Sequence, residues 1–187
     1  MKNEKLKKLI LCAVFVDLIA AGAFMRIPIP VLPFTLQYLF TMLAGLLLGG
    51  RLGGIAVSVY VILGLIGLPI FTQGGGPGYV AQPTFGYLVG FAAGAYLTGK
   101  IANQVEKPGY KRLLIANFAG LAVVYAFGMI YYYFVSNYYL NVPIEVWPLF
   151  LYCFLLAIPG DILLCFVGAF LGKRLIPILK PERMSRA

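Results

Sequence analysis

The chain has 187 residues, of which 61% are apolar or aromatic and 11% are charged. About a quarter of the residues of a soluble domain are usually charged, so this composition excludes an ordinary soluble domain, and the long apolar blocks exclude a coiled coil or a disordered tail. The 15 lysines and arginines outnumber the 6 acidic residues, and because they gather between the apolar blocks they indicate a membrane surface and no nucleic-acid partner.

Six apolar blocks follow one another along the chain. A helix that spans a bilayer needs about 20 residues, so six of them use about 120 and leave about 65 for tails and loops. The sequence therefore predicts an all-α polytopic membrane protein with a single domain over residues 1–187. The predicted spans cover residues 9–25, 34–49, 54–68, 84–101, 113–135 and 148–172. The second and third spans are short, so we expect them to tilt or to be shielded by their neighbours.

The basic residues near the ends of the blocks predict the orientation. With the N-terminus in the cytoplasm, six crossings bring the C-terminus back to the cytoplasm, and every lysine and arginine except Arg26 then lies on the inner side. The first block follows four lysines, as the apolar part of a signal peptide would. We expect it to be retained as a helix because it carries Asp17 and because five further blocks follow.

Small residues recur four positions apart inside three blocks, a spacing that lets helix backbones approach closely in lipid. These residues are Gly45 and Gly49, then Gly86, Gly90 and Gly94, and finally Gly168 and Gly172. Cys12, Cys153 and Cys165 also lie in apolar blocks and match no metal or redox spacing. We expect the glycines to pack helices together and the cysteines to serve as small buried side chains.

Two segments on the predicted outer side suggest a binding pocket. Residues 26–37 contain Pro28, Pro30 and Pro33, which favour an extended path, and residues 69–83 contain four glycines that allow positive φ and close backbone approach. Amides and aromatic rings alternate with them, a mixture that suits a small polar ring with an apolar remainder. The candidate binding residues here and in the neighbouring blocks are Phe34, Thr35, Gln37, Gln73, Gly75, Gly76, Tyr79, Gln82, Phe85 and Tyr152.

Charged residues in or beside the spans add three further candidates. Asp161 lies in the sixth block directly after Pro159 and Gly160, which we expect to kink the helix beside a cavity. Because a carboxylate that faces lipid is costly, Asp161 is interpreted as a ligand for substrate, with a structural pairing as the alternative. Asp17 has no helix-breaking neighbour and is interpreted as a structural hydrogen bond or an interhelical contact. Arg26 either anchors the chain at the outer interface or pairs with an anionic group of the substrate.

Catalytic and metal-binding residues are not predicted. The chain has no histidine, no pair of carboxylates at a catalytic spacing and no nucleophile beside a base. The sequence therefore predicts a binding or transport protein, not an enzyme, and one without a cofactor.

Taken in their order and spacing, four motifs resemble the BioY family, the biotin-specific substrate-capture subunits (S components) of energy-coupling factor (ECF) transporters. The motifs are Arg26-Ile-Pro-Ile-Pro30 with Pro33-Phe-Thr-Leu-Gln37, Gly74-Gly-Gly-Pro-Gly-Tyr79, Pro83-Thr-Phe-Gly-Tyr-Leu88 and Pro159-Gly-Asp161. The resemblance extends from the first predicted span to the sixth.

The resemblance implies a compact six-helix S-component bundle in the cell membrane of a prokaryote, with a vitamin site that faces outside. Biotin would be bound non-covalently and carried inward without chemical change. The partners would be a transmembrane coupling protein and two cytoplasmic ABC-type ATPases.

Two positions depart from the family pattern. The family commonly has Asp-x-x-Lys in the sixth span, whereas this chain has Leu164 at the position of the lysine. We expect Arg26 or loop amides to replace that charge, with Leu164 beside the substrate. The family also tends to have Ala-x-x-x-Ala on the first helix, where S components dock on the coupling protein. Here Asp17 follows Ala13 at that spacing, so docking is expected to centre on Ala13, Asp17 and Ala20.

Two other functions stay open at this stage. An S component for another small vitamin would have the same bundle and differ only in its loops. A stand-alone facilitator for small solutes would show a polar stripe through several spans. The polar residues here are isolated and concentrated in the outer half, which favours a site that is closed at its inner end.

Overall fold

The computed structural model describes residues 2–27 and 34–179, and these ranges form a bundle of helices. Within them, six helices have 12 or more residues, which confirms the predicted all-α, six-helix class. They are α1 (Lys2–Phe24), α2 (Gln37–Leu48), α3 (Gly50–Leu65), α4 (Phe85–Ala102), α5 (Tyr110–Phe134) and α7 (Ile158–Leu179). Pro28, Pro30 and Pro33 of the first outer segment, and the basic residues beyond Leu179, lie outside the described residues.

Shorter elements connect the long helices on one side of the bundle. Two-residue strands β1 (Arg26–Ile27) and β2 (Phe34–Thr35) pair antiparallel, and the 3₁₀ helix η1 (Pro77–Ala81) precedes α4. Helix α6 (Val146–Phe150) leads into the last long helix. The second predicted span thus begins as a strand and turns helical only at Gln37, because Phe34 and Thr35 are held in the pairing with β1.

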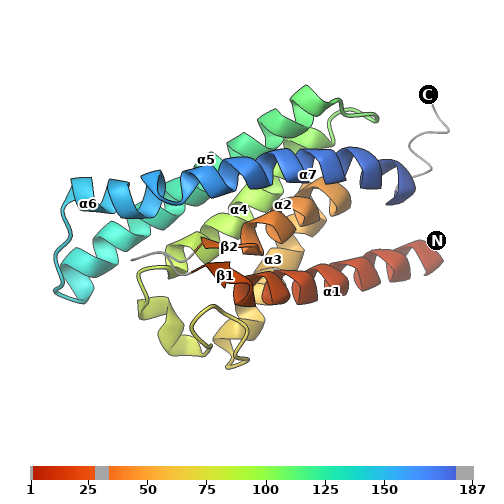
Figure 1. Cartoon of the computed structure of the whole chain (residues 1–187). Coiled ribbons are helices and arrows are strands. Elements are labelled where there is room, and N and C mark those ends of the chain that lie inside the picture. Colours follow the sequence, from red (N-terminus) through yellow and green to blue (C-terminus); the bar gives the residue numbers. More distant parts are fainter. Residues whose placement is uncertain (1, 28–33, 180–187) are drawn as a thin grey trace.

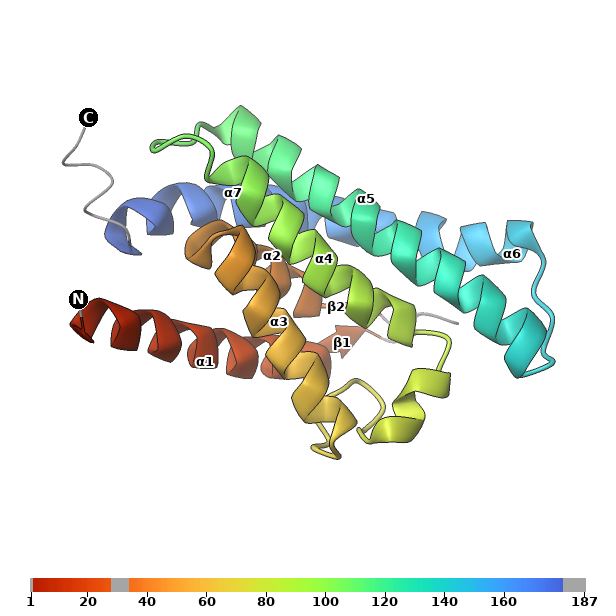
Figure 2. The same cartoon turned by 180° about the vertical axis from the view of Figure 1, so that it is seen from behind.

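The long helices run back and forth along one axis. Helix α1 begins and α7 ends at the same end of the bundle, as an even number of crossings requires (Figure 1). The view from behind shows α4 and α5 side by side along most of their lengths (Figure 2). Among the described residues, two helical runs are long and apolar enough by themselves to cross a bilayer, Tyr110–Tyr139 and Val146–Leu179.

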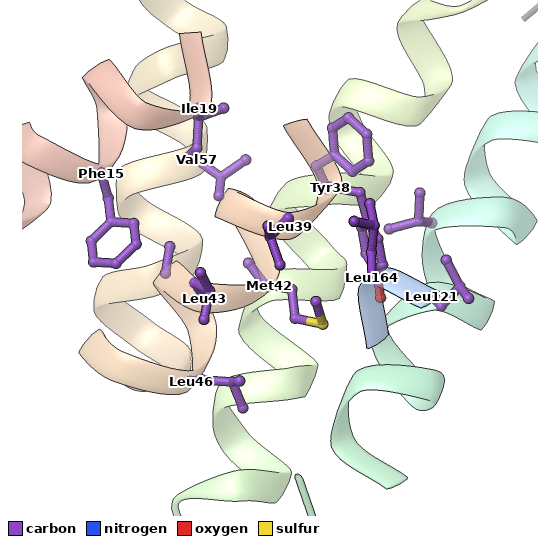
Figure 3. Close-up of a cluster of buried hydrophobic side chains, with 14 of the residues drawn as sticks. Phe15, Ile19, Tyr38, Leu39, Met42, Leu43, Leu46, Val57, Leu121 and Leu164 are labelled. Atoms are coloured by element: carbon purple, nitrogen blue, oxygen red, sulfur yellow. The ribbon is translucent and has the colours of Figure 1, made fainter. Parts of the chain in front are cut away.

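Helix α2 has only 12 residues and is the centre of the core. At 1.5 Å per residue such a helix is about 18 Å long, too short to span the hydrocarbon layer of about 30 Å. Its side chains are nevertheless buried almost throughout, because α1, α3, α4 and α7 pack around it. Figure 3 shows the side chains of α2 between those of α1 on one side and Leu121 and Leu164 on the other.

Glycines bring α4 and α5 into close contact. A Cβ atom on Gly90 would lie 2.9 Å from the carbonyl oxygen of Val124, and one on Gly94 would lie 2.9 Å from that of Gly120. The predicted packing role of the α4 glycines therefore agrees with the structure. Gly49 is different, because it has φ +88° and nothing lies within 4 Å of its Cβ position. It makes the turn between α2 and α3, a conformation that favours glycine.

The last helical run is interrupted just before Asp161. A π-helical turn, Leu151–Leu155, precedes the break, and the amide of Leu156 donates to the carbonyl of Leu151, five residues earlier. Helix α7 then begins at Ile158, with Pro159 in its first turn, where a missing N–H costs nothing. The kink predicted from Pro159 and Gly160 is thus a break that leaves Asp161 in the first turn of a new helix.

We predict that Gly90→Ala lowers the apparent melting temperature of the protein in detergent. The added methyl group would meet backbone atoms of Val124, so α4 and α5 must separate, at a cost of about 1–3 kcal/mol. Gly78→Ala is the matched control, because nothing lies within 4 Å of its Cβ position. Equal melting temperatures of the two variants would contradict this account of α4–α5 packing.

Candidate functional site

A cavity opens at the end of the bundle that lies away from the start of α1. Its empty space, part of which is open to solvent, amounts to about 710 Å³. Its walls are β2, the starts of α2, α4 and α7, the middle of α5 and the segment before α4 that includes η1. The lining residues are Phe34, Thr35, Gln37, Tyr38, Thr72, Gln73, Tyr79, Thr84, Tyr87, Leu88, Phe91, Leu121, Val124, Tyr125, Ala157 and Asp161.

Six of the residues singled out in the sequence come together in this cavity, although they are far apart along the chain. They are Phe34, Thr35, Gln37, Gln73, Tyr79 and Asp161. No lysine or arginine is among the described residues that line the cavity, and Asp161 is its one carboxylate. The cavity therefore offers a negative group surrounded by aromatic and amide side chains.

The Asp161 carboxylate is held by a tyrosine of a neighbouring helix. The hydroxyl of Tyr125 on α5 donates a hydrogen bond of 2.5 Å to Oδ2 of Asp161. Because Asp161 is in the first turn of α7, the positive end of the helix dipole also favours its negative charge. Each carboxylate oxygen accepts more than one hydrogen bond, so capacity remains for a donor on a ligand.

Gln37 supplies an amide whose donor is unused. The side chain is 2% exposed at the start of α2 and lines the cavity, and its Nε2 has no hydrogen-bond partner among the described residues. A buried donor without a partner costs about 1–3 kcal/mol. The Gln37 amide is therefore suited to an acceptor atom on a bound molecule.

Aromatic rings form much of the wall. The Tyr38 and Phe91 rings stack with centroids 6.2 Å apart, and the Phe71 ring, 4.5 Å from that of Tyr79, backs the loop side. Burial raises the pKa of the Tyr79 phenol above its ordinary value of 10, so the hydroxyl keeps its proton. Rings of this kind bury a flat or apolar group while their hydroxyls stay available for hydrogen bonds.

Arg26 lies at the surface beside the cavity and is not part of its lining. Its Nη1 donates a hydrogen bond of 2.9 Å to the carbonyl oxygen of Thr72, which does line the cavity. In β1, Arg26 also pairs with Thr35 of β2, another lining residue. The side chain thus joins the two outer segments and leaves further N–H donors of its guanidinium facing the surface.

The structure places the remaining predicted residues around the cavity but outside its lining. Gly76 has φ +104° and its amide donates to the carbonyl of Gly64, and Gly75 packs against the Leu68 carbonyl, so both shape the loop. Phe85 packs edge-on against Tyr131, with ring centroids 5.8 Å apart.

Three further residues lie farther from the cavity wall. Gln82 is exposed, and its backbone forms hydrogen bonds at the end of η1. Tyr152 is half-buried in the π-helical turn before α7. Leu164 is buried in the core, so the position of the family lysine is filled by apolar packing instead of facing the cavity.

The residues expected to dock a partner lie on α1. Ala13 and Asp17 are exposed, one turn apart on the same face, whereas Ala20 is half-buried and packs against the core. An exposed face with a small residue is thus present on α1, and Ala20 lies at its edge.

Several lining residues were missed in the sequence, because aromatic residues in a membrane span have an ordinary explanation as packing or interface residues. Their helical spacing was the available signal. Thr84, Leu88 and Phe91 follow one another at intervals of four and three on α4, with Tyr87 beside them. On α5, Val124 and Tyr125 follow Leu121 by three and four residues, so these side chains share one helix face and line the cavity.

Comparison with known proteins gives a consistent picture. The model of the BioY family matches residues 1–181. A probable biotin transporter BioY of Lysinibacillus sphaericus is 44% identical over 183 residues, covering 98% of this chain and 93% of that protein. The biotin transporter BioY of Thermotoga maritima is 39% identical over 137 residues, covering 73% of this chain and 78% of the relative.

A solved structure has the same fold. The S component for biotin from an ECF-type ABC transporter superposes with a TM-score of 0.75 at 30% sequence identity. The match covers 94% of this chain and 93% of that one.

We predict that Tyr125→Phe destabilises the ligand-free protein more than Tyr87→Phe does. Loss of the Tyr125 hydroxyl removes the hydrogen bond to Asp161, with a cost of about 1–3 kcal/mol. The Tyr87 hydroxyl is the matched control because it makes only a 3.4 Å contact with the carbonyl of Cys153. Thermal unfolding in detergent measures the difference, and a larger loss in Tyr87→Phe would contradict the assignment.

Proposed function

Because this chain belongs to the BioY family, we propose that it is the biotin-binding, substrate-capture subunit of an ATP-driven vitamin importer of the ECF type. It is a transport protein and not an enzyme. The observation that carries the proposal is the cavity itself, in which one carboxylate and one unpartnered amide lie among aromatic rings. Biotin would be held there non-covalently, with no cofactor, and released unchanged on the inner side.

The chemistry of biotin fits these groups. Its ureido ring has two N–H donors and one carbonyl acceptor, its thioether ring is apolar, and its tail ends in a carboxylate. A ureido N–H suits the Asp161 carboxylate, and the ureido carbonyl suits the Nε2 of Gln37. The rings of Tyr38 and Phe91 would pack against the apolar part.

Charge favours one orientation of the vitamin. Two carboxylates in a site of low dielectric repel each other, so the tail of biotin is not expected next to Asp161. We infer that the ureido ring lies deep, beside α7, and that the tail points toward the outer segments. Arg26, at the cavity edge, would then attract the carboxylate of the tail, in place of the lysine that the family has where this chain has Leu164.

The same function implies a location and partners. The termini are proposed to lie in the cytoplasm of a prokaryotic cell, with the cavity facing outside across the cell membrane. The exposed face of α1 around Ala13 and Asp17, with Ala20 at its edge, would dock on a transmembrane coupling protein. Two cytoplasmic ABC-type ATPases would supply the energy for import.

We predict that the purified wild-type chain in detergent binds biotin without the coupling module. Isothermal titration with biotin at micromolar concentration should give saturable heat at one site per chain. Riboflavin and thiamine serve as controls, and neither should displace biotin. Heat equal to the buffer blank would contradict the proposed function, and displacement by another vitamin would reassign the substrate.

We predict that Asp161→Asn weakens biotin binding at least about tenfold, or about 1.4 kcal/mol. The amide places an N–H donor where the carboxylate accepts, so one ureido hydrogen bond is lost. Asp17→Asn makes the same chemical change on the exposed face of α1 and should leave the affinity unchanged. An Asp161→Asn variant with wild-type affinity would refute the role of Asp161 as a ligand.

A further inference from the structure

Beneath the cavity, a polar side chain joins α5 to α7 in the middle of an apolar core. Asn117 of α5 is 0% exposed, and its Nδ2 donates a hydrogen bond of 2.9 Å to the backbone carbonyl of Cys165 on α7. The hydroxyl of Tyr38, on α2, donates a bond of 2.9 Å to the backbone carbonyl of Asn117. Three helices are therefore tied together at one level of the bundle.

This level lies about one turn below the candidate site on α7 and about two turns below it on α5. Cys165 follows Asp161 by four residues on α7, and Asn117 precedes Tyr125 by eight residues on α5. The α5–α7 contact thus has two polar links, from Tyr125 to Asp161 in the cavity and from Asn117 to Cys165 beneath it.

The Asn117 side chain is poorly explained as a source of stability alone. Its Oδ1 is buried and has no partner among the described residues, which costs about 1–3 kcal/mol that an apolar side chain would avoid. A polar residue in an otherwise apolar helix interface is known to specify register at some cost in stability. Gly168 of α7 lies beside Asn117 at this level, because a Cβ atom there would lie at an ordinary contact distance of 3.5 Å from Nδ2 of Asn117. The closest approach at Gly168 is to α2, since the same Cβ atom would lie 2.3 Å from Cε of Met42.

Register matters because of helix geometry. A shift of α7 by one residue relative to α5 would rotate the Asp161 side chain by about 100° around the helix axis, away from the cavity. The Tyr125–Asp161 bond joins two flexible side chains and does not by itself hold the backbone. The hydrogen bond from Asn117 ends on the backbone carbonyl of Cys165, so it holds the backbone of α7.

We propose that Asn117 is a positioning residue that sets the register of α7 and thereby aims Asp161 into the binding cavity. The proposal rests on the proposed function, since it concerns the same cavity. It assigns Asn117 no contact with biotin. Removal of its amide should change the surroundings of Asp161 even when no ligand is present.

The test compares Asn117→Leu, which is close in volume, with Thr98→Val. Thr98 is 1% exposed on α4, and its hydroxyl donates a 3.1 Å bond to the carbonyl of Ala116, the residue before Asn117. The control variant therefore removes a buried bond at the same depth that does not reach α7. If Asn117→Leu does not yield folded protein, Asn117→Ser, which is smaller and polar, takes its place.

The first readout does not need biotin. The chain has only two aspartates, Asp17 and Asp161. Protein made by cell-free synthesis with ¹³C at the side-chain carboxyl carbon of aspartate therefore gives two carboxyl signals in a carbon NMR spectrum. Asp161→Asn identifies the Asp161 signal. We expect Asn117→Leu to move that signal and Thr98→Val to leave it in place. An unmoved Asp161 signal in the Asn117 variant, or an equal shift in the Thr98 variant, overturns the proposal.

The second readout is biotin titration of the same variants. We expect Asn117→Leu to lose about tenfold in affinity, or about 1.4 kcal/mol, while Thr98→Val stays within about twofold of wild type. Equal losses in both variants would mean a general structural effect and would overturn the proposal. If wild type itself fails to bind biotin, the proposed function fails, and the carboxyl signal still decides the role of Asn117.

Discussion

A carboxylate among apolar helices must be given hydrogen-bond partners, and this constraint organises the cavity end of the bundle. Asp161 receives one partner from Tyr125, and its place at the start of α7 adds the helix dipole. For that arrangement the last helical run has to break before Pro159, and α5 and α7 have to lie close together. The cavity is the space that remains between these helices and the starts of α2 and α4.

Close packing beside and below the cavity supports its walls. Gly90 and Gly94 bring α4 against α5, and the short helix α2 fills the centre beneath the cavity. The bundle is therefore closely packed around a cavity that opens at one end, a form that suits capture of a molecule from one side of a membrane. Gln37 lines this cavity with a buried amide N–H that has no partner within the described residues.

Much of the fold could be predicted from sequence because apolar blocks and basic loops report directly on membrane spans. The helix break near Pro159 was predictable for a similar reason, since proline has no N–H to donate. The strand at Phe34–Thr35 was not, because it depends on pairing with Arg26–Ile27 and not on local preference. Tyr125 and Asn117 were missed because their roles depend on which helix they face, and apolar periodicity alone does not fix the partner helix.

The central claim is that biotin occupies the cavity with its ureido ring on Asp161, and an experimental structure of the chain with biotin bound tests it most directly. The account predicts density for the bicyclic ring between Tyr38 and Tyr125, with a ureido nitrogen within hydrogen-bond distance of the Asp161 carboxylate and the tail directed toward Arg26. Biotin bound elsewhere on the bundle, or in this cavity with its tail carboxylate beside Asp161, would contradict it.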